Sequence, residues 1–405
     1  MSVKLNTNLI RLLVGEGVSV LGSYMYQFSI IWWIYGETGS KSLTGMVMIA
    51  TYLPSVFLSP IGGSIVDRCS KKSALIITNL VQSCLFLVAF FFLEVNLFNT
   101  TSLILITLCL SVCGAFFQPA IKSIIPMLAE ENQVVKVNSY QQVINNVGKI
   151  VGPVFGMFLV SHFGIFIVLI TNSISYLISA FLEKGIKYKE IDVTELKKER
   201  GFKKGLKESF FFLKKDIFLL NIVFIVCVIN LFTSSLQLLY PSLIKDDLGL
   251  SESFYSSSIS LMAVGAITVS TLLSYFPIMK NNKSIMMIIS LLIYGGSVFS
   301  LAIYEEAFII ILLFFLIGFS MTLFNIILIS YMQIIIPGKM QGKIFGTVIG
   351  ISGGLIPVSY ALFGYLGDIL ANSVLFILIG IVLIISAVYI LNVQRIVKLR
   401  TKSLS

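Results

Sequence analysis

Two ionisable residues stand deep inside long apolar stretches of the sequence. Glu16 lies in the first such stretch, and Lys149 lies near the middle of the fifth. A charged side chain inside a membrane is costly, and it is therefore a candidate functional group. We predict that Glu16 and Lys149 take part in proton coupling, with Glu16 as the carboxylate that binds and releases the proton. The alternative is a structural pairing of Glu16 with Lys149 or with Arg11.

Polar residues continue from Glu16 along one face of the same helix. Ser19, Ser23 and Gln27 follow at spacings of three and four residues, and Tyr26 flanks them. Further polar residues lie in the fourth, fifth, seventh and tenth apolar stretches: Ser111, Gln118, Asn145, Asn230, Ser234, Gln237 and Asn325. We predict that these side chains line a substrate cavity. The alternative is that they form hydrogen bonds between helices.

The composition indicates the environment of these residues. Of the 405 residues, 57% are hydrophobic and only 12% are charged, whereas a soluble domain carries roughly a quarter charged residues. At about 20 residues per membrane span, the apolar runs predict an all-α membrane protein with twelve transmembrane helices. The predicted spans are 8–35, 43–66, 73–93, 101–125, 139–160, 165–182, 217–239, 253–279, 285–304, 307–335, 344–367 and 373–392.

These spans divide into two groups of six. We predict an N-terminal bundle over 1–182, a cytoplasmic linker over 183–216, a C-terminal bundle over 217–394 and a cytoplasmic tail over 395–405. The linker mixes basic and acidic residues and is expected to be solvated from Glu183 onward, with an amphipathic helix over 203–215 on the inner membrane surface. The two halves also share a weak sequence similarity, since Gln118 to Pro126 after the fourth span resembles Asn325 to Pro337 after the tenth. Such internal repeats are typical of secondary transporters.

The positions of the charges predict the orientation. With twelve spans, nearly all basic residues fall on the side that holds both termini, so we expect both termini to be cytoplasmic. Lys245, Asp246 and Asp247 are expected in an outer loop. The net charge of +10 therefore reflects membrane orientation rather than binding to nucleic acid.

The loop between the second and third spans carries a distinctive motif. It contains Gly63, Asp67, Arg68, Lys71 and Lys72. The glycine is expected to let the second helix pack closely against a neighbour, and the paired lysines to hold the loop inside. Asp67 could accept hydrogen bonds from the first amides of another helix. We therefore predict that Asp67 and Arg68 gate the cytoplasmic side rather than bind substrate.

This loop resembles the Gly-x-x-x-Asp-Arg-x-Gly-Arg/Lys-Arg/Lys motif of the major facilitator superfamily, with Ser70 in place of the second glycine. The fifth span is similar to the glycine-proline motif of the antiporter branches of that superfamily, through Gly148, Gly152, Pro153 and Gly156. The flanking glycines are replaced, by Ser139 and Met157. The resemblance implies a major facilitator fold of two six-helix bundles that works by alternating access.

A finer resemblance covers most of the chain. The segments 37–40, 117–126 and 337–346 are similar to those of the macrolide-efflux branch. This resemblance implies a drug:proton antiporter of the cell membrane that uses the proton gradient without a cofactor and confers antibiotic resistance. Many drug:proton antiporters carry an arginine in the fourth span, whereas this sequence has no arginine over 108–114. Any proton-coupling machinery must therefore differ.

The sequence lacks the motifs of several other function classes. It shows no phosphate-binding Gly-x-x-x-x-Gly-Lys-Ser/Thr loop, no catalytic triad spacing and no metal cluster, so we predict neither an enzyme nor a metal site. The expected partners are a small-molecule substrate and membrane lipid, not nucleic acid, for a monomeric protein. Three alternatives remain open: an exporter of an endogenous metabolite or metallophore, a lipid flippase of the same fold, and a membrane receptor or channel.

Overall fold

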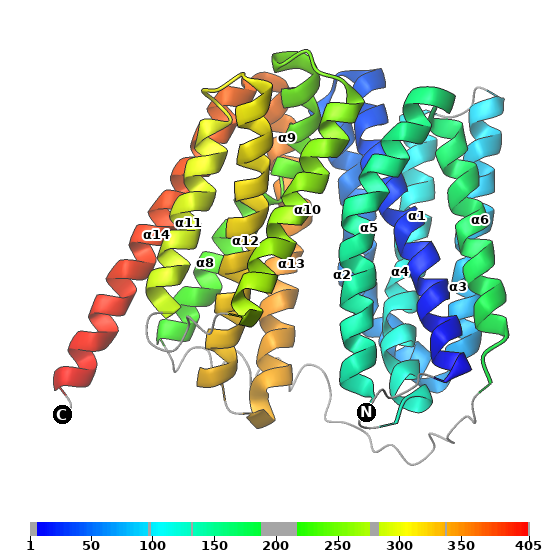
Figure 1. Ribbon diagram of the computed structural model, residues 1–405, viewed down its shortest axis with the longest axis horizontal. Coiled ribbons are helices and arrows are strands. Elements are labelled where there is room, and N and C mark those ends of the chain that lie inside the picture. Colours follow the sequence, from blue (N-terminus) through cyan, green and yellow to red (C-terminus); the bar gives the residue numbers. More distant parts are fainter. Residues whose placement is uncertain are drawn as a thin grey trace. The chain divides into compact units, whose positions relative to one another are not determined.

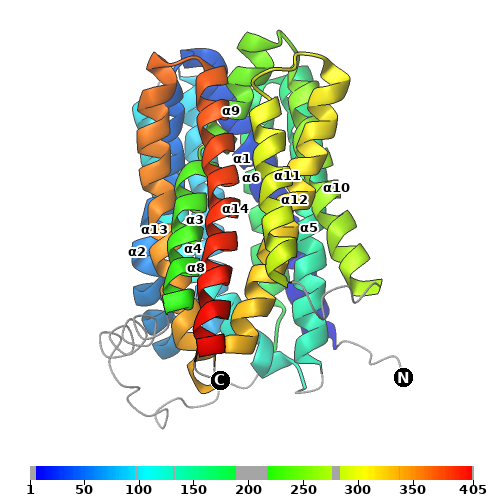
Figure 2. The ribbon, with the colours of Figure 1, turned by 90° about the vertical axis from the view of Figure 1, so that its left-hand side faces the viewer.

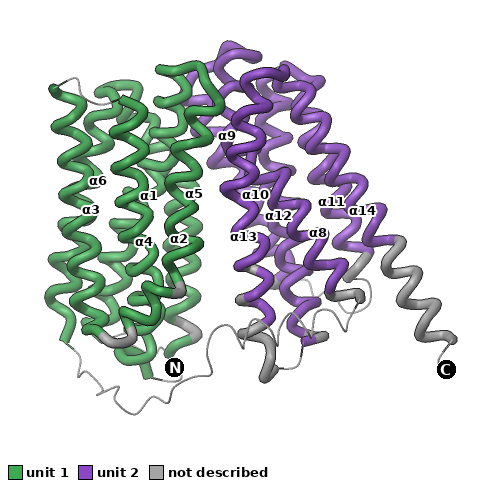
Figure 3. The backbone as a smooth tube through the Cα atoms, turned by 180° about the vertical axis from the view of Figure 1, so that it is seen from behind, with its two compact units in different colours: residues 1–196 green, residues 197–405 purple. Residues whose placement is uncertain are grey.

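A computed structural model describes residues 6–95, 99–130, 133–187, 217–275, 283–336 and 338–403. The chain forms two compact units, Met1–Leu196 and Lys197–Ser405 (Figure 3). Most of the predicted linker, including the amphipathic helix expected over 203–215, lies outside the described residues. The description below therefore treats each unit by itself.

Unit 1 consists of long helices joined by short connections (Figure 1). The side chains of Asn6, Ser40 and Asn99 each cap the first turn of a helix, as these residue types favour. Gly39 ends the first helix with a φ of 62°, a conformation that glycine adopts without strain. The helices are α1 (Thr7–Thr38), α2 (Lys41–Arg68), α3 (Lys71–Glu94), α4 (Thr100–Leu128), α5 (Val134–Phe163) and α6 (Ile165–Lys184).

Unit 2 repeats this arrangement with one interrupted helix. Its elements are α8 (Ile217–Thr233), α9 (Leu236–Ser242), the π-helical segment η2 (Leu243–Asp247), α10 (Glu252–Tyr275), α11 (Lys283–Ser300), α12 (Ala307–Ile335), α13 (Gly338–Ile369) and α14 (Asn372–Ser403). In Figures 1 and 2, α11 and α14 lie side by side, and the two helices pack against each other. The helix α14 also continues well beyond the span predicted to end at residue 392.

The seventh predicted span, 217–239, was too short. Helical structure continues through α9 and η2, so Lys245, Asp246 and Asp247 belong to a helical turn rather than an outer loop. Asn372 explains the extension, because its side-chain amide donates to Asp247 at 2.7 Å while its oxygen accepts from the Ser242 hydroxyl at 2.9 Å. This contact with the start of α14 depends on tertiary structure.

The helices pair in the same order in both units. In unit 1, α2 packs on α4, α3 on α6, and α1 on α5. In unit 2, α10 packs on α12, α11 on α14, and α8 on α13. Each pair brings together helices that are not consecutive in the chain. The two units are therefore structural repeats, in keeping with the sequence echo between the halves.

Glycines allow the closest of these contacts. A Cβ added to Gly318 of α12 would overlap the carbonyl oxygen of Met262 in α10, and one added to Gly62 of α2 would overlap the carbonyl oxygen of Ala115 in α4. The prediction that Gly63 makes the close approach was wrong by one residue. A Cβ on Gly63 would lie 3.9 Å from the Pro119 Cβ, which is an ordinary contact.

Within the described part of the chain, nine helices are long and apolar enough to cross a membrane. The first helix is not among them, since Glu16, Gln27 and several serines lower its hydropathy. Large apolar side chains remain exposed along these helices, for example Phe57 at 67% and Phe181 at 77%. Such surfaces suit contact with lipid. The count of twelve spans stays a prediction.

Candidate functional site

The buried carboxylate of Glu16 forms the centre of the candidate site. Only 5% of Glu16 is exposed, and both carboxylate oxygens accept hydrogen bonds from the side-chain amide of Gln141, at 3.0 and 2.8 Å. Among the described residues no cation pairs with Glu16. Arg11 instead donates to the carbonyl of Gly185, and Lys149 lies on an exposed side of α5. The ion pairs considered as alternatives for Glu16 are therefore not formed in this structure.

The contact between Glu16 and Gln141 depends on how tightly α5 packs against α1. A Cβ added to Gly152 would lie 2.6 Å from the Tyr24 Cβ, and one added to Gly156 would lie 2.7 Å from the Ser29 hydroxyl. Gly148 meets the Tyr24 ring in the same way. Glycines at four-residue intervals, with Pro153 among them, thus let the two helices approach closely. This approach sets the rotation of α5 that turns Gln141 toward Glu16.

Two of the remaining polar residues of α1 bond to other helices of unit 1. Ser23 shares a hydrogen bond of 2.8 Å with the Tyr176 hydroxyl of α6, and Gln27 donates to the Tyr52 hydroxyl of α2 at 3.2 Å. Ser19 is buried, and its hydroxyl donates to carbonyls of its own helix. For Ser23 and Gln27 this geometry matches the alternative of hydrogen bonds between helices.

An aromatic cluster lies beside this polar face. Tyr26 meets the Phe86 ring edge-on, with ring centroids 4.8 Å apart, and Phe86 stacks on Tyr176 at 5.7 Å. Leu169 and Ile106 pack against the same cluster. Tyr26 therefore contributes to the interior of unit 1 through its ring.

The other predicted cavity residues of unit 1 differ in exposure. Ser111 of α4 is buried and donates to the carbonyl of Thr51 in α2 at 2.6 Å. Asn145 is half-buried and donates to the carbonyl of Gln141 one turn earlier. Gln118 is exposed beside Pro119, in the second half of α4. Ser111 thus links two helices, whereas the amide of Gln118 is open to a ligand.

In unit 2, three of the four predicted residues lie where the helix formed by α8 and α9 is interrupted. The amide of Ser234 donates to the carbonyl of Asn230 at 3.2 Å where α8 ends, and both residues are half-buried. Gln237 accepts from the Tyr360 hydroxyl of α13 at 3.1 Å. Asn325 of α12 is exposed and donates only to the carbonyl of Met321 in its own helix. Breaks in helices supply polar backbone at sites of this kind in transporters.

A second buried carboxylate was missed by the sequence interpretation. Glu183 was assigned to a solvated linker, but it lies in the last turn of α6 and is fully buried. Its carboxylate accepts from the Asn79 amide of α3 at 2.8 Å and from the Ser179 hydroxyl at 3.4 Å. Asn79 also donates to the Ser179 hydroxyl at 3.0 Å. The spacing of four residues between Ser179 and Glu183 indicated a shared helix face.

The three residues lie close to the centre of the candidate site. Ser179 touches α1 directly, since a Cβ added to Gly15 would lie 3.3 Å from its hydroxyl. Glu16 follows Gly15 in α1, and Glu183 lies one turn after Ser179 in α6. The interior of unit 1 therefore holds two acids, each bonded by neutral donors.

Substitution of Asn79 tests this arrangement. We expect Asn79→Leu to lower the free energy of unfolding by about 1–3 kcal/mol, since a buried acceptor loses its main donor. Asn79→Leu combined with Glu183→Leu should be more stable than Asn79→Leu alone, because no buried acid is then left unsatisfied. Thermal unfolding of the purified protein in detergent measures both effects.

The control is Thr78→Val, since the Thr78 hydroxyl bonds only to carbonyls of its own helix. This variant should unfold close to the wild-type temperature. A double variant less stable than Asn79→Leu alone would contradict the arrangement.

The gating motif is described only in part. The helix α2 ends at Arg68, but the side chains of Asp67 and Arg68 lie outside the described residues. Lys71 is buried at the start of α3, and the Lys72 ammonium donates to the carbonyl of Ile186 at 2.7 Å. Lys72 therefore ties the start of α3 to the end of α6. The gating role of Asp67 and Arg68 stays a prediction.

Two repeated sets of apolar helices are the architecture of a multi-pass membrane transporter. The chain belongs to the Major Facilitator Superfamily, whose family model matches residues 12–356. Two solved structures share this fold. They are the nucleoside transporter NupG (TM-score 0.75, 13% identity, 96% of this chain and 99% of that one) and a bacterial homologue of the iron transporter ferroportin in an inward-facing state (TM-score 0.71, 15% identity, 94% and 98%).

Two bacterial relatives match this chain over different lengths. Macrolide efflux protein A of Streptococcus pyogenes is 30% identical over 151 residues, which is 36% of this chain and 36% of that protein. The chain thus matches about a third of the length of this relative. The uncharacterized MFS-type transporter YvqJ of Bacillus subtilis is 21% identical over 389 residues, 94% of this chain and 91% of that protein.

Proposed function

We propose that this transporter exports small amphipathic compounds of the macrolide type in exchange for protons. The observation that carries the proposal is Glu16, a buried carboxylate held by Gln141 without a cation among the described residues. An acid in such a setting can exist in either protonation state, because neither state breaks an ion pair. The local similarity to macrolide efflux protein A supports the substrate class.

The polar residues that remain open fit such a ligand. In unit 1, Gln118 is an exposed amide and Lys149 an exposed amine, and in unit 2 Asn325 is an exposed amide. Uncharged amides suit ligands that are bound by shape and a few hydrogen bonds. In this proposal the protein lies in the cell membrane with both termini in the cytoplasm, as its basic residues indicate.

Purified protein in proteoliposomes tests the proposal. A macrolide added to one side should drive protons out of the opposite compartment, toward the side of addition, when the protein is present, and a pH-sensitive dye reports this movement. Protein-free vesicles and vesicles with collapsed gradients are the controls. Macrolide flux without proton movement would refute the antiport mechanism, and proton movement driven only by other compounds would refute the substrate class.

A second candidate is export of a compound that the cell itself makes. The putative bacilysin exporter BacE of Bacillus subtilis is 26% identical over 232 residues, 55% of this chain and 54% of that protein. The same proteoliposomes distinguish the two functions. Extracts of the cell that makes this protein are added in place of the macrolide, and the proton movement that each produces is compared.

A further inference from the structure

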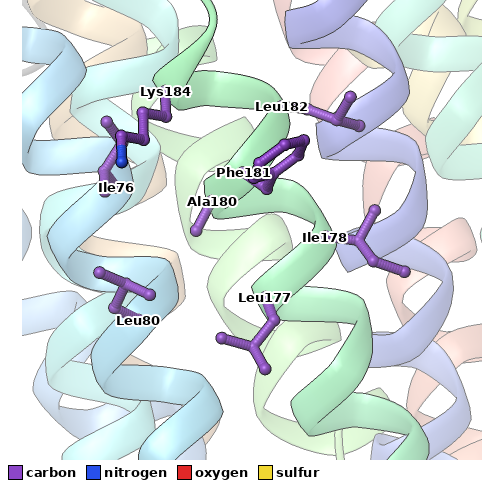
Figure 4. Close-up of a pocket in the computed structure, with 8 residues that line it drawn as sticks. All are labelled: Ile76, Leu80, Leu177, Ile178, Ala180, Phe181, Leu182 and Lys184. Atoms are coloured by element: carbon purple, nitrogen blue, oxygen red, sulfur yellow. The ribbon is translucent and has the colours of Figure 1, made fainter.

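A groove runs along the outside of unit 1 between α3 and α6. Its volume is about 520 Å³. Ile76 and Leu80 line it from α3, and Leu177, Phe181 and Lys184 line it from α6 (Figure 4). We call it the α3–α6 groove. No residue of the candidate site lines it.

The walls of the groove have the properties of a lipid-facing surface. Leu80, Leu177 and Phe181 are exposed by 42%, 44% and 77%. Ile178 of α6, which also lines the groove, is exposed by 43%, and Ile77, the neighbour of Ile76 in α3, is exposed by 59%. Since α3 and α6 are both long and apolar enough to span a membrane, these side chains face hydrocarbon in the membrane. The apolar lining of the groove suits a hydrocarbon chain.

Cationic side chains collect at one end of the groove. Lys184 is the last residue of α6 and is exposed, and Figure 4 shows it at the end of the groove farthest from Leu177. An adjoining hollow of about 380 Å³ shares Phe181 and Lys184 and is also lined by Arg11. One arm of the Arg11 guanidinium donates to the Gly185 carbonyl, so its other N–H groups remain for a ligand. Lys187 is exposed nearby in the chain.

Among the described residues that line the groove and the adjoining hollow there is no acid. Glu183, between these cations in the sequence, is fully buried and turned toward Asn79. A span that ends at Lys184 places this ammonium at the depth of the lipid headgroups. The site thus combines an apolar groove within the hydrocarbon region with cations at the membrane surface.

We propose that the α3–α6 groove binds one anionic phospholipid. An acyl chain lies between Leu80 and Leu177, and the headgroup phosphate bonds to Lys184 and Arg11. Guanidinium groups bind phosphate through paired hydrogen bonds, and lysine adds a point charge. This binding goes beyond the transport function and does not require it.

Native mass spectrometry of the purified chain tests the proposal, with phosphatidylglycerol and phosphatidylcholine of the same acyl chains as probes. We expect wild-type protein to retain one phosphatidylglycerol in preference to phosphatidylcholine. Lys184→Gln should weaken this retention about fivefold, the effect of one lysine near an anionic headgroup. Lys122→Gln, at an exposed lysine of α4, is the matched control and should bind as wild type does.

A second pair of variants tests the groove itself. Leu177→Trp fills it and should abolish selective retention, whereas Ile174→Trp, one turn earlier and 49% exposed, should not. Equal retention of both lipids by the wild type, or unchanged retention in Lys184→Gln and Leu177→Trp, would overturn the proposal. Because the measurement needs no substrate, its failure would leave the proposed transport function untouched.

Discussion

Replacement of Glu16 by glutamine should stop substrate-driven proton movement while the protein stays folded. The glutamine keeps the shape of the protonated acid and can still bond to Gln141, which now holds both carboxylate oxygens. It cannot release a proton. We expect proton flux to fall by at least about a hundredfold, the usual cost of losing a positioned proton-transfer group. Exchange of labelled substrate without a gradient should persist.

The matched control is Glu37→Gln, an exposed acid near the end of the same helix. Proton flux in this variant should equal that of the wild type. Both variants are compared in proteoliposomes at equal protein density, with the melting temperature in detergent as a check of folding. Wild-type proton flux in Glu16→Gln would remove this residue from the coupling mechanism.

The second large effect is expected at Gly318. A Cβ at this position would overlap the Met262 carbonyl oxygen, and backbone atoms cannot move away as a flexible side chain can. Gly318→Ala must therefore separate α10 from α12 or distort one of them. We expect a loss of about 3 kcal/mol or more in the free energy of unfolding, at the upper end of overpacking effects. The yield of monodisperse protein should fall accordingly.

Gly296 of α11 provides the comparison. A Cβ there would meet no atom within 4 Å. Gly296→Ala should therefore be neutral or should stabilise the protein by up to about 1 kcal/mol through helix propensity. Size-exclusion profiles and melting temperatures in one detergent measure both variants. A Gly318→Ala protein as stable as Gly296→Ala would contradict the close packing of α10 on α12.

Much of the fold was predictable because most of the helices correspond to long apolar runs in the sequence. The predicted span 165–182 corresponds closely to α6, and 73–93 lies within α3. The prediction failed where a tertiary contact decides the boundary. The seventh helix extends to Asp247 because Asn372, distant in the chain, bonds to it. Hydropathy alone reads the charged residues 245–247 as the start of a loop.

The candidate site was predictable in part. A carboxylate inside an apolar run is conspicuous, so Glu16 was recognised from its type and position. Its partner was not, because the rotation of α5 that presents Gln141 depends on close contacts of Gly148 and Gly152 with Tyr24. Glu183 was missed for the opposite reason. Glu183 is the first residue of a segment rich in charged residues, and the composition of that segment predicted a solvated side chain. In the structure Glu183 belongs to the last turn of α6 and is buried.

The pairing of α1 with α5 and α6 has a consequence for biosynthesis. About a hundred residues separate the end of α1 at Thr38 from the start of α5 at Val134. At ribosomal speed this distance corresponds to about 5–20 seconds of translation. During this time Glu16 has neither Gln141 nor the helices that bury it, and α1 is not among the helices apolar enough to span the membrane by composition. Until α5 has been synthesised, the Glu16 side chain of the nascent α1 therefore has to be kept out of the hydrocarbon core, in contact with water or with another protein.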